Sequence, residues 1–110
     1  MTRRGNVLEP GDVVLARVQF VDTAESKTRP ALVLYGEHGN LVVAGITSNP
    51  EMKGISLSKK DGAIKESVIK LNYIFTLSQD AVERRLFCLG KEKKKEVFKA
   101  LCARLSGLEK

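Results

Sequence analysis

One arginine and two hydroxyl side chains stand at the ends of an apolar stretch, and together they could bind an anion. Arg29 lies just before the apolar run Ala31–Tyr35. Thr47 and Ser48 lie just after a second run, Leu41–Ile46. An arginine offers five N–H donors in a planar fork suited to phosphate oxygens, and it keeps its proton. These residues therefore predict a phosphate site, with a structural ion pair as the alternative for Arg29.

The chain between these ends is expected to bring them together. Both runs are rich in Val, Leu and Ile and are bounded by Gly and Asn, which predicts two buried strands. The polar link at 36–40 predicts a hairpin turn. If the strands are antiparallel neighbours, this hairpin places Arg29 close to Thr47 at one end of a sheet. Such a set of donors can hold a phosphodiester and stabilise the extra charge of its pentavalent transition state.

Further strands are predicted on both sides of the hairpin, over Asp12–Phe20, Ile55–Leu57, Ser67–Phe75 and Arg85–Leu89. Ser78 is expected to cap a short helical turn. Alternation along the third of these strands groups Lys70 with Asn72 on one face and Tyr73 with Phe75 on the other. The polar segment Val21–Thr28 has no periodicity, so it is expected to form a loop, and its place directly before Arg29 favours a functional loop.

One helix is predicted, over Lys91–Leu105. Its apolar residues recur at intervals of three and four, which is typical of a buried stripe. The stripe comprises Val97, Phe98, Leu101, Cys102, Leu105 and Leu108. Many short strands, Gly-rich turns and one terminal helix predict a mainly β fold, a small and strongly bent β-barrel with the helix packed on it. The length of 110 residues predicts a single domain over 1–110.

The composition favours a polyanion as partner. The formal net charge is +6, from 19 Lys and Arg against 13 Asp and Glu. Such a balance attracts nucleic acids, although lysine-rich surfaces also serve solubility. Aromatic residues make up only 5% of the chain, and no aromatic-rich strand pattern indicates stacked bases.

Several other chemistries are excluded or disfavoured. The chain has no Gly-rich phosphate loop ending in Lys-Ser/Thr, and one histidine with two scattered cysteines does not make a zinc site of common spacing. His38 lies in the predicted turn and is expected to be solvated. Cys88 and Cys102 are expected to be buried structural thiols. No apolar run approaches the ~20 residues that span a bilayer, and the N-terminus does not resemble a signal peptide, so a cytoplasmic location is expected.

Three blocks of sequence together resemble the MazF/PemK/Kid family of toxin ribonucleases. They are Gly11-Asp12-Val13-Val14, Arg29-Pro30-Ala31-Leu32-Val33-Leu34 and Ile46-Thr47-Ser48. The later segment Ser67-Val68-Ile69, with Ile74 and Thr76, falls in step with the same family. The resemblance covers nearly the whole chain, with the helix in the expected place.

The resemblance implies an SH3-like barrel, a homodimer and cleavage of single-stranded RNA without a metal or other cofactor. In that family the 2′-hydroxyl attacks the neighbouring phosphate, which leaves a 2′,3′-cyclic phosphate and a 5′-hydroxyl. A partner antitoxin neutralises the toxin. The family's catalytic arginine and threonine correspond to Arg29 and Thr47. Four further residues are expected to bind RNA: Lys27, Thr28, Ser48 and Asn72.

The chain departs from the family's pattern in the loop before Arg29 and in the strand after Ser67. Residues 23–28 lack the glycine and histidine common in that loop, and Asn72 stands near a position that is acidic in some members. Phe75 stands where the family has a basic residue. A non-catalytic RNA- or protein-binding member of the same fold is therefore the alternative reading, and a toxin acting on a protein target is a third.

Overall fold

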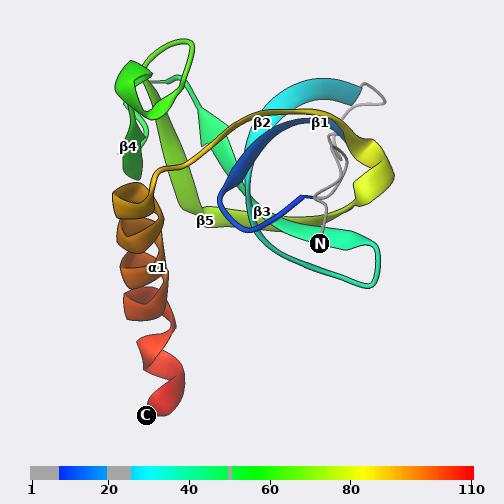
Figure 1. Ribbon diagram of the computed structural model, residues 1–110. Coiled ribbons are helices and arrows are strands. Elements are labelled where there is room, and N and C mark those ends of the chain that lie inside the picture. The colour runs from blue at the N-terminus through cyan, green and yellow to red at the C-terminus, as the bar shows by residue number, and fades with distance from the viewer. Residues whose placement is uncertain (1–7, 20–25, 50) are drawn as a thin grey trace.

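Within residues 8–19, 26–49 and 51–110, which the computed structural model describes, six strands form one curled antiparallel sheet that a single α-helix follows (Figure 1). The order across the sheet is β4-β5-β3-β2-β1-β6. The elements are β1 (Asp12–Gln19), β2 (Ser26–Glu37), β3 (Asn40–Thr47), β4 (Ile55–Leu57), β5 (Ser67–Ser78), β6 (Val82–Cys88) and α1 (Lys91–Leu105). The mainly β fold with a C-terminal helix is confirmed.

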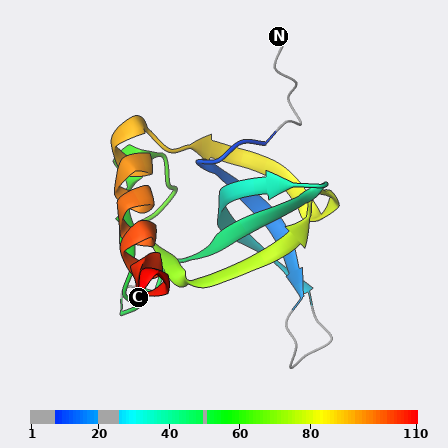
Figure 2. The same ribbon diagram turned by 90° about the horizontal axis from the view of Figure 1, so that it is seen from below.

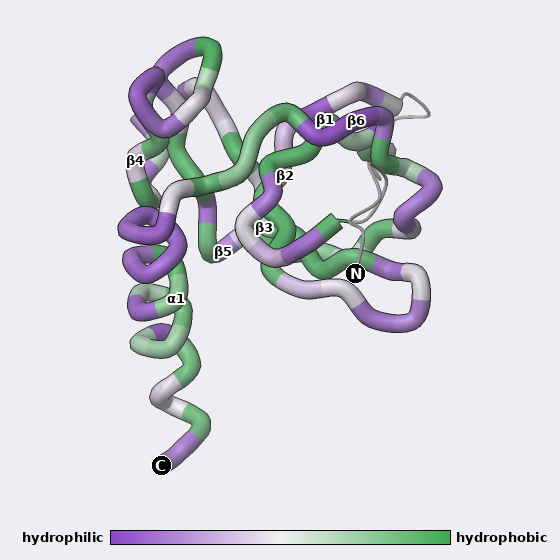
Figure 3. Tube along the Cα trace, in the orientation of Figure 1, coloured by the Kyte–Doolittle hydropathy of each residue, from purple (hydrophilic) through white to green (hydrophobic). Residues whose placement is uncertain are grey.

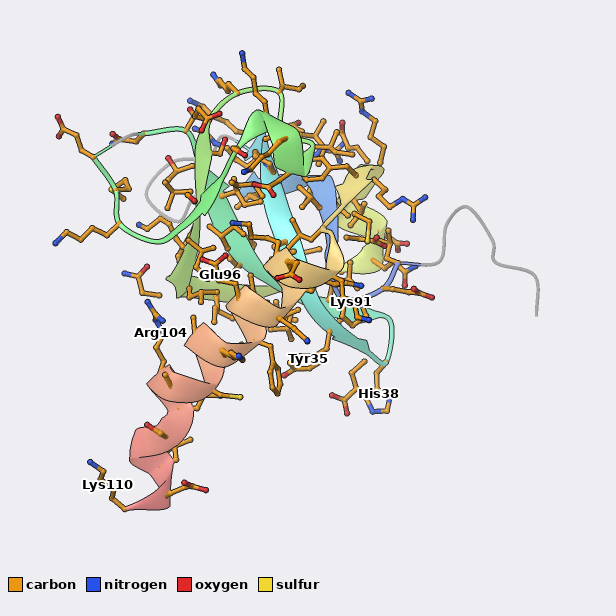
Figure 4. All side chains as sticks on the ribbon, turned by 60° about the vertical axis from the view of Figure 1, so that its left-hand side comes forward. Tyr35, His38, Lys91, Glu96, Arg104 and Lys110 are labelled. Atoms are coloured by element: carbon orange, nitrogen blue, oxygen red, sulfur yellow. The ribbon has the colours of Figure 1, made fainter. Side chains whose placement is uncertain are left out.

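The predicted hairpin between β2 and β3 is confirmed, and its turn is tighter than expected. The strands are antiparallel, and Glu37 pairs with Asn40 across a two-residue turn. His38 and Gly39 both have positive φ, 54° and 82°. Two such residues make the type I′ turn whose twist matches that of the flanking strands. His38 is exposed at the tip, as expected (Figure 4).

The second strand begins earlier than predicted. Ser26, Lys27 and Thr28 pair with β1, in the register Gln19↔Ser26, Val18↔Lys27 and Arg17↔Thr28. The prediction of a loop is therefore wrong for these three residues. Strand pairing uses backbone groups, so the polar side chains of Lys27 and Thr28, which are exposed, do not oppose it. The rest of the predicted loop, with Phe20, falls at positions 20–25, outside the described residues.

Two apolar clusters lie on opposite faces of the sheet. On β1, Val13 belongs to the first cluster and its neighbour Val14 to the second, and on β2 Leu32 and Val33 divide in the same way. Successive side chains of a strand point to opposite faces, so a sheet covered on both sides needs apolar residues at consecutive positions. Figure 2 shows α1 along one side of the sheet, and its Val97 packs on the first cluster.

The helix is less buried than its apolar stripe predicts. Val97 is buried, whereas Phe98, Leu105 and Leu108 are 67%, 53% and 83% exposed. The helix runs past the sheet, so its second half has no sheet beneath it (Figure 1). Cys88 and Cys102 are both exposed, so the expectation of buried thiols is wrong.

Hydrophilic and hydrophobic residues occupy different parts of the fold. The hairpin tip and the first turns of α1 are hydrophilic, and the strands that cross the sheet are mostly hydrophobic (Figure 3). Among the described residues no helix combines the length and apolarity needed to cross a membrane.

Candidate functional site

Arg29 lies on the face of β2 that carries the second apolar cluster. It alternates with Ala31 and Val33, which are buried in that cluster, and it pairs with Ala16 of β1, which also belongs to it. Unlike these neighbours, Arg29 is exposed. The guanidinium therefore extends from the end of a buried apolar row.

The register of β2 and β3 directs Thr47 toward the same row. The pairing begins at Ala31↔Gly45, and continuing it by two residues would set Arg29 opposite Thr47. Residues directly opposite in an antiparallel pair share a face. Thr47 itself pairs with Val68 of β5 and is half-buried.

The Thr47 hydroxyl is held in a turn. The backbone N–H of Asn49 donates to Thr47 Oγ1 at 3.1 Å, and Asn49 Oδ1 accepts from the N–H of Glu51 at 3.0 Å. A hydroxyl has one proton and two lone pairs, so a threonine that accepts in this way can still donate. Thr47 is therefore positioned to donate a hydrogen bond to an anion.

The predicted RNA-binding residues divide between the faces. Lys27 alternates with Arg29 along β2 and shares its face, whereas Thr28 lies on the opposite face. Both side chains are exposed, as is Ser48, which follows the last residue of β3. Asn72 is exposed in the middle of β5.

An irregularity in the pairing of β5 with β3 affects the face of the sheet that carries Arg29. Gly45 pairs with Lys70, but the preceding residue of β3, Ala44, pairs with Ile74. Residues 71–73 therefore have no partners in β3, and the strand bulges. Lys70 shares the face of Gly45 because it lies directly opposite.

The aromatic ring of Tyr73 lies against Gly45. A Cβ at position 45 would come within 2.6 Å of Tyr73 Cδ2. The ring packs at 5.2 Å from that of Phe75, tilted by 40°, and the ammonium group of Lys70 lies 5.9 Å from its centroid. Sequence reasoning missed Tyr73, Lys70 and Gly45 as site residues, because simple alternation put Tyr73 on the face away from Lys70.

The arrangement suits a chain of phosphates. Lys27, Arg29 and Lys70 place three cationic side chains on the face of the sheet toward which the register directs Thr47. Lysine supplies a point charge, and arginine supplies two parallel N–H donors to one phosphate. Among the described residues, no group of three or more His, Cys, Asp or Glu side chains is arranged to hold a metal ion.

Solved structures of similar fold include toxins of bacterial origin. MazE–MazF from Deinococcus radiodurans superposes with a TM-score of 0.74 at 20% identity, over 91% of this chain and 96% of that one. Toxin MazF-mt6 of Mycobacterium tuberculosis gives 0.70 at 20% identity, over 86% and 96%. An endoribonuclease in complex with its cognate antitoxin, from a mycobacterial species, gives 0.67 at 15% identity, over 90% and 93%.

Sequence comparison assigns the family. No curated protein matches the chain by sequence. The family model described as the PemK-like, MazF-like toxin of type II toxin-antitoxin systems matches residues 9–105 of the 110. The chain therefore belongs to the PemK-like, MazF-like family of toxins of type II toxin-antitoxin systems.

Proposed function

We propose that this protein is an endoribonuclease toxin that cleaves single-stranded RNA without a metal ion. The 2′-hydroxyl of one nucleotide loses its proton and attacks the adjacent phosphorus atom. The bond from phosphorus to the 5′-oxygen breaks, and that oxygen takes up a proton. The products are a 2′,3′-cyclic phosphate and a 5′-hydroxyl, so the step is a transesterification in which no water is consumed.

In this proposal Arg29 and Thr47 act on the same phosphate. The guanidinium neutralises the charge that develops on the non-bridging oxygens, and the Thr47 hydroxyl orients the phosphate by donating to one of those oxygens. The observation that carries the proposal is the β2–β3 register, which directs both residues to one end of one face. Lys27, Ser48 and Asn72 are proposed to contact the RNA on either side.

Two protein partners are proposed as well. Membership of a toxin–antitoxin family supports an antitoxin as the cognate inhibitor. A homodimer is supported by the exposed apolar side of α1 and by a hollow of about 310 Å³ between α1 and β2. Tyr35 lies beside the helix at this hollow (Figure 4).

The test is incubation of a long RNA with the purified protein in EDTA. The wild type is expected to cut it and leave cyclic-phosphate ends. Arg29→Ala is expected to be about 10²–10³-fold slower, since removing one preorganised donor typically costs that much. Thr47→Val is expected to lose activity in the same way, and Thr47→Ser to keep most of it because it keeps the hydroxyl.

Arg104→Ala is the matched control, because it removes one arginine from the exposed surface of α1 and should leave the rate unchanged. RNA left intact by a folded wild-type protein would contradict the enzymatic proposal. RNA binding without cleavage would then favour the non-catalytic alternative. The exposed Asn72 supports that alternative, since an amide cannot exchange a proton as a carboxylate does.

A further inference from the structure

An exposed aromatic ring lies on the face proposed to hold the RNA. Tyr73 is 47% exposed and belongs to neither apolar cluster of the sheet. Phe75, by contrast, is partly buried and packs on the second cluster. The Tyr73 ring is therefore part of the molecular surface and does not pack in the hydrophobic core.

Three features hold this ring in place. The bulge at 71–73 turns Tyr73 onto the face of Lys70. Gly45 leaves room for one edge of the ring, because a Cβ there would come within 2.6 Å of Tyr73 Cδ2. Phe75 packs beside the ring at 5.2 Å between centroids. A ring held at one edge by Gly45 and packed beside Phe75 loses little further freedom when a flat ligand binds it.

The ring lies one short step from the phosphate site. Gly45 is two residues before Thr47 on β3, and its partner Ala31 is two residues after Arg29 on β2. Two residues of a strand span about 6.5–7 Å. That separation is on the scale of one nucleotide step of an extended strand, so a base next to the bound phosphate would reach the ring.

We propose that Tyr73 is a stacking platform for the base of the nucleotide next to the cleaved phosphate, with Lys70 contacting the phosphate that flanks it. This inference rests on the proposed function and adds a substrate-binding residue to it. Aromatic side chains and cationic groups in one groove are the usual combination for single strands, and stacking tolerates any base. The platform holds the strand in line with Arg29 and Thr47 whatever the sequence.

Tyrosine fluorescence tests the contact directly. The chain has no tryptophan and two tyrosines, so Tyr35→Phe leaves Tyr73 as the single tyrosine emitter. The probe is a mixed-sequence pool of 2′-fluoro RNA decamers, which lack the attacking hydroxyl. We expect these to quench the emission, and decamers of the same backbone without bases to leave it unchanged. Equal quenching by both, or none by either, overturns the proposal.

Affinity for the same pool provides the second test. Tyr73→Leu keeps an apolar cover over Gly45 and is expected to weaken binding about 5- to 100-fold, the worth of one base–aromatic stack. Tyr73→Phe keeps the ring and should bind within about twofold of the wild type. Wild-type affinity in Tyr73→Leu, or an equal loss in Tyr73→Phe, overturns the stacking role.

These experiments distinguish failure of the stacking proposal from failure of the endoribonuclease proposal. The decamers cannot be cut, so quenching and affinity report the platform even if the protein has no ribonuclease activity. If long RNA is cleaved and Tyr73→Leu leaves both KM and decamer affinity unchanged, the platform is excluded and the endoribonuclease proposal stands. If the decamers show base-dependent quenching and long RNA stays intact, the enzymatic proposal fails and the binding platform is supported.

Discussion

At the scale of single residues, Gly45 is required for the space that it leaves. Its φ does not lie in the left-handed region, unlike those of Gly11, Gly39 and Gly62. The requirement is instead steric, since a Cβ there would come within 2.6 Å of the Tyr73 ring. The position of the Tyr73 ring therefore requires that residue 45 has no side chain.

Gly45→Ala is expected to destabilise the fold by about 1–3 kcal/mol, the usual cost of overpacking, and to displace the Tyr73 ring. Thermal unfolding measures the first effect, and RNA affinity measures the second. Gly107→Ala is the control, because nothing lies within 4 Å of a Cβ at that position. Adding Tyr73→Ala to Gly45→Ala should recover part of the stability, and a further additive loss would contradict the steric explanation.

The proposed phosphate site depends on two side chains, those of Arg29 and Thr47. A planar cation and a hydroxyl held by the Asn49 N–H can neutralise and orient one phosphate. Lys27 and Lys70 then extend the positive face along the strand direction. The substitutions of Arg29 and Thr47 described above separate the contribution of the cation from that of the hydroxyl.

At the scale of elements, the short turn between β4 and β5 contacts α1. Asp61 Oδ2 accepts the Ser58 backbone N–H at 2.8 Å and the Ser58 hydroxyl at 3.1 Å. Lys93 of α1 lies 4.0 Å from the same oxygen and donates to the Ser56 carbonyl at 2.9 Å. The Ser58 N–H, with the Ser58 hydroxyl and the Lys93 and Lys60 charges, lowers the pKa of Asp61 despite partial burial.

This turn predicts a loss of stability in acid. A carboxyl whose pKa is lower in the folded chain stabilises the fold above its unfolded pKa, here 3.8, and the contribution disappears as the pH falls through the folded pKa. Asp61→Asn is expected to cost about 1 kcal/mol at pH 7, the usual worth of such a cap.

Chemical denaturation at pH 7 and at pH 3 measures the effect. The gap between wild type and Asp61→Asn should narrow at the lower pH, because the wild-type carboxyl then begins to protonate. Asp80→Asn, in the exposed turn before β6, is the matched control and should change stability little. A gap that is constant with pH would show that the carboxylate charge does not contribute.

At the scale of the whole molecule, α1 and the turn that follows it expose apolar side chains. Phe98 and Leu105, seven residues apart, lie on one side of α1, Leu108 follows the end of the helix, and all three are largely exposed. Exposed apolar groups that cluster in this way are typical of protein interfaces. The proposed homodimer would bury them.

Phe98→Asp is expected to weaken the dimer at least tenfold, because it would place a charge in an apolar interface. Sedimentation over a range of protein concentrations measures this. Ala103→Asp adds the same charge on the other side of the helix and should leave the dimer intact. A wild-type monomer at all concentrations, or equal effects of the two variants, would contradict an interface at this surface.

Local sequence determined the hairpin, and one irregularity in its pairing decided which groups meet at its end. The apolar runs 31–35 and 41–46, separated by the polar link at 36–40, favour an antiparallel pair of strands. The register that the turn sets shifts by one residue between Val33 and Tyr35, and only the shifted register, continued, sets Arg29 opposite Thr47. The short turn capped by Ser78 was also predictable, because Ser78 Oγ accepts from the N–H of Asp80, only two residues further along the chain.

Tertiary structure alone decided which face Tyr73 occupies and how much of α1 is covered. Strict alternation assigns Tyr73 to the face away from Lys70, but the bulge at 71–73 shifts the alternation, and Phe75 after it lies on the second cluster. Nothing local marks such a bulge, because it is a property of the pairing between β5 and β3 and not of the residues of β5 alone. Likewise, the apolar stripe of α1 does not show where the sheet beneath it ends.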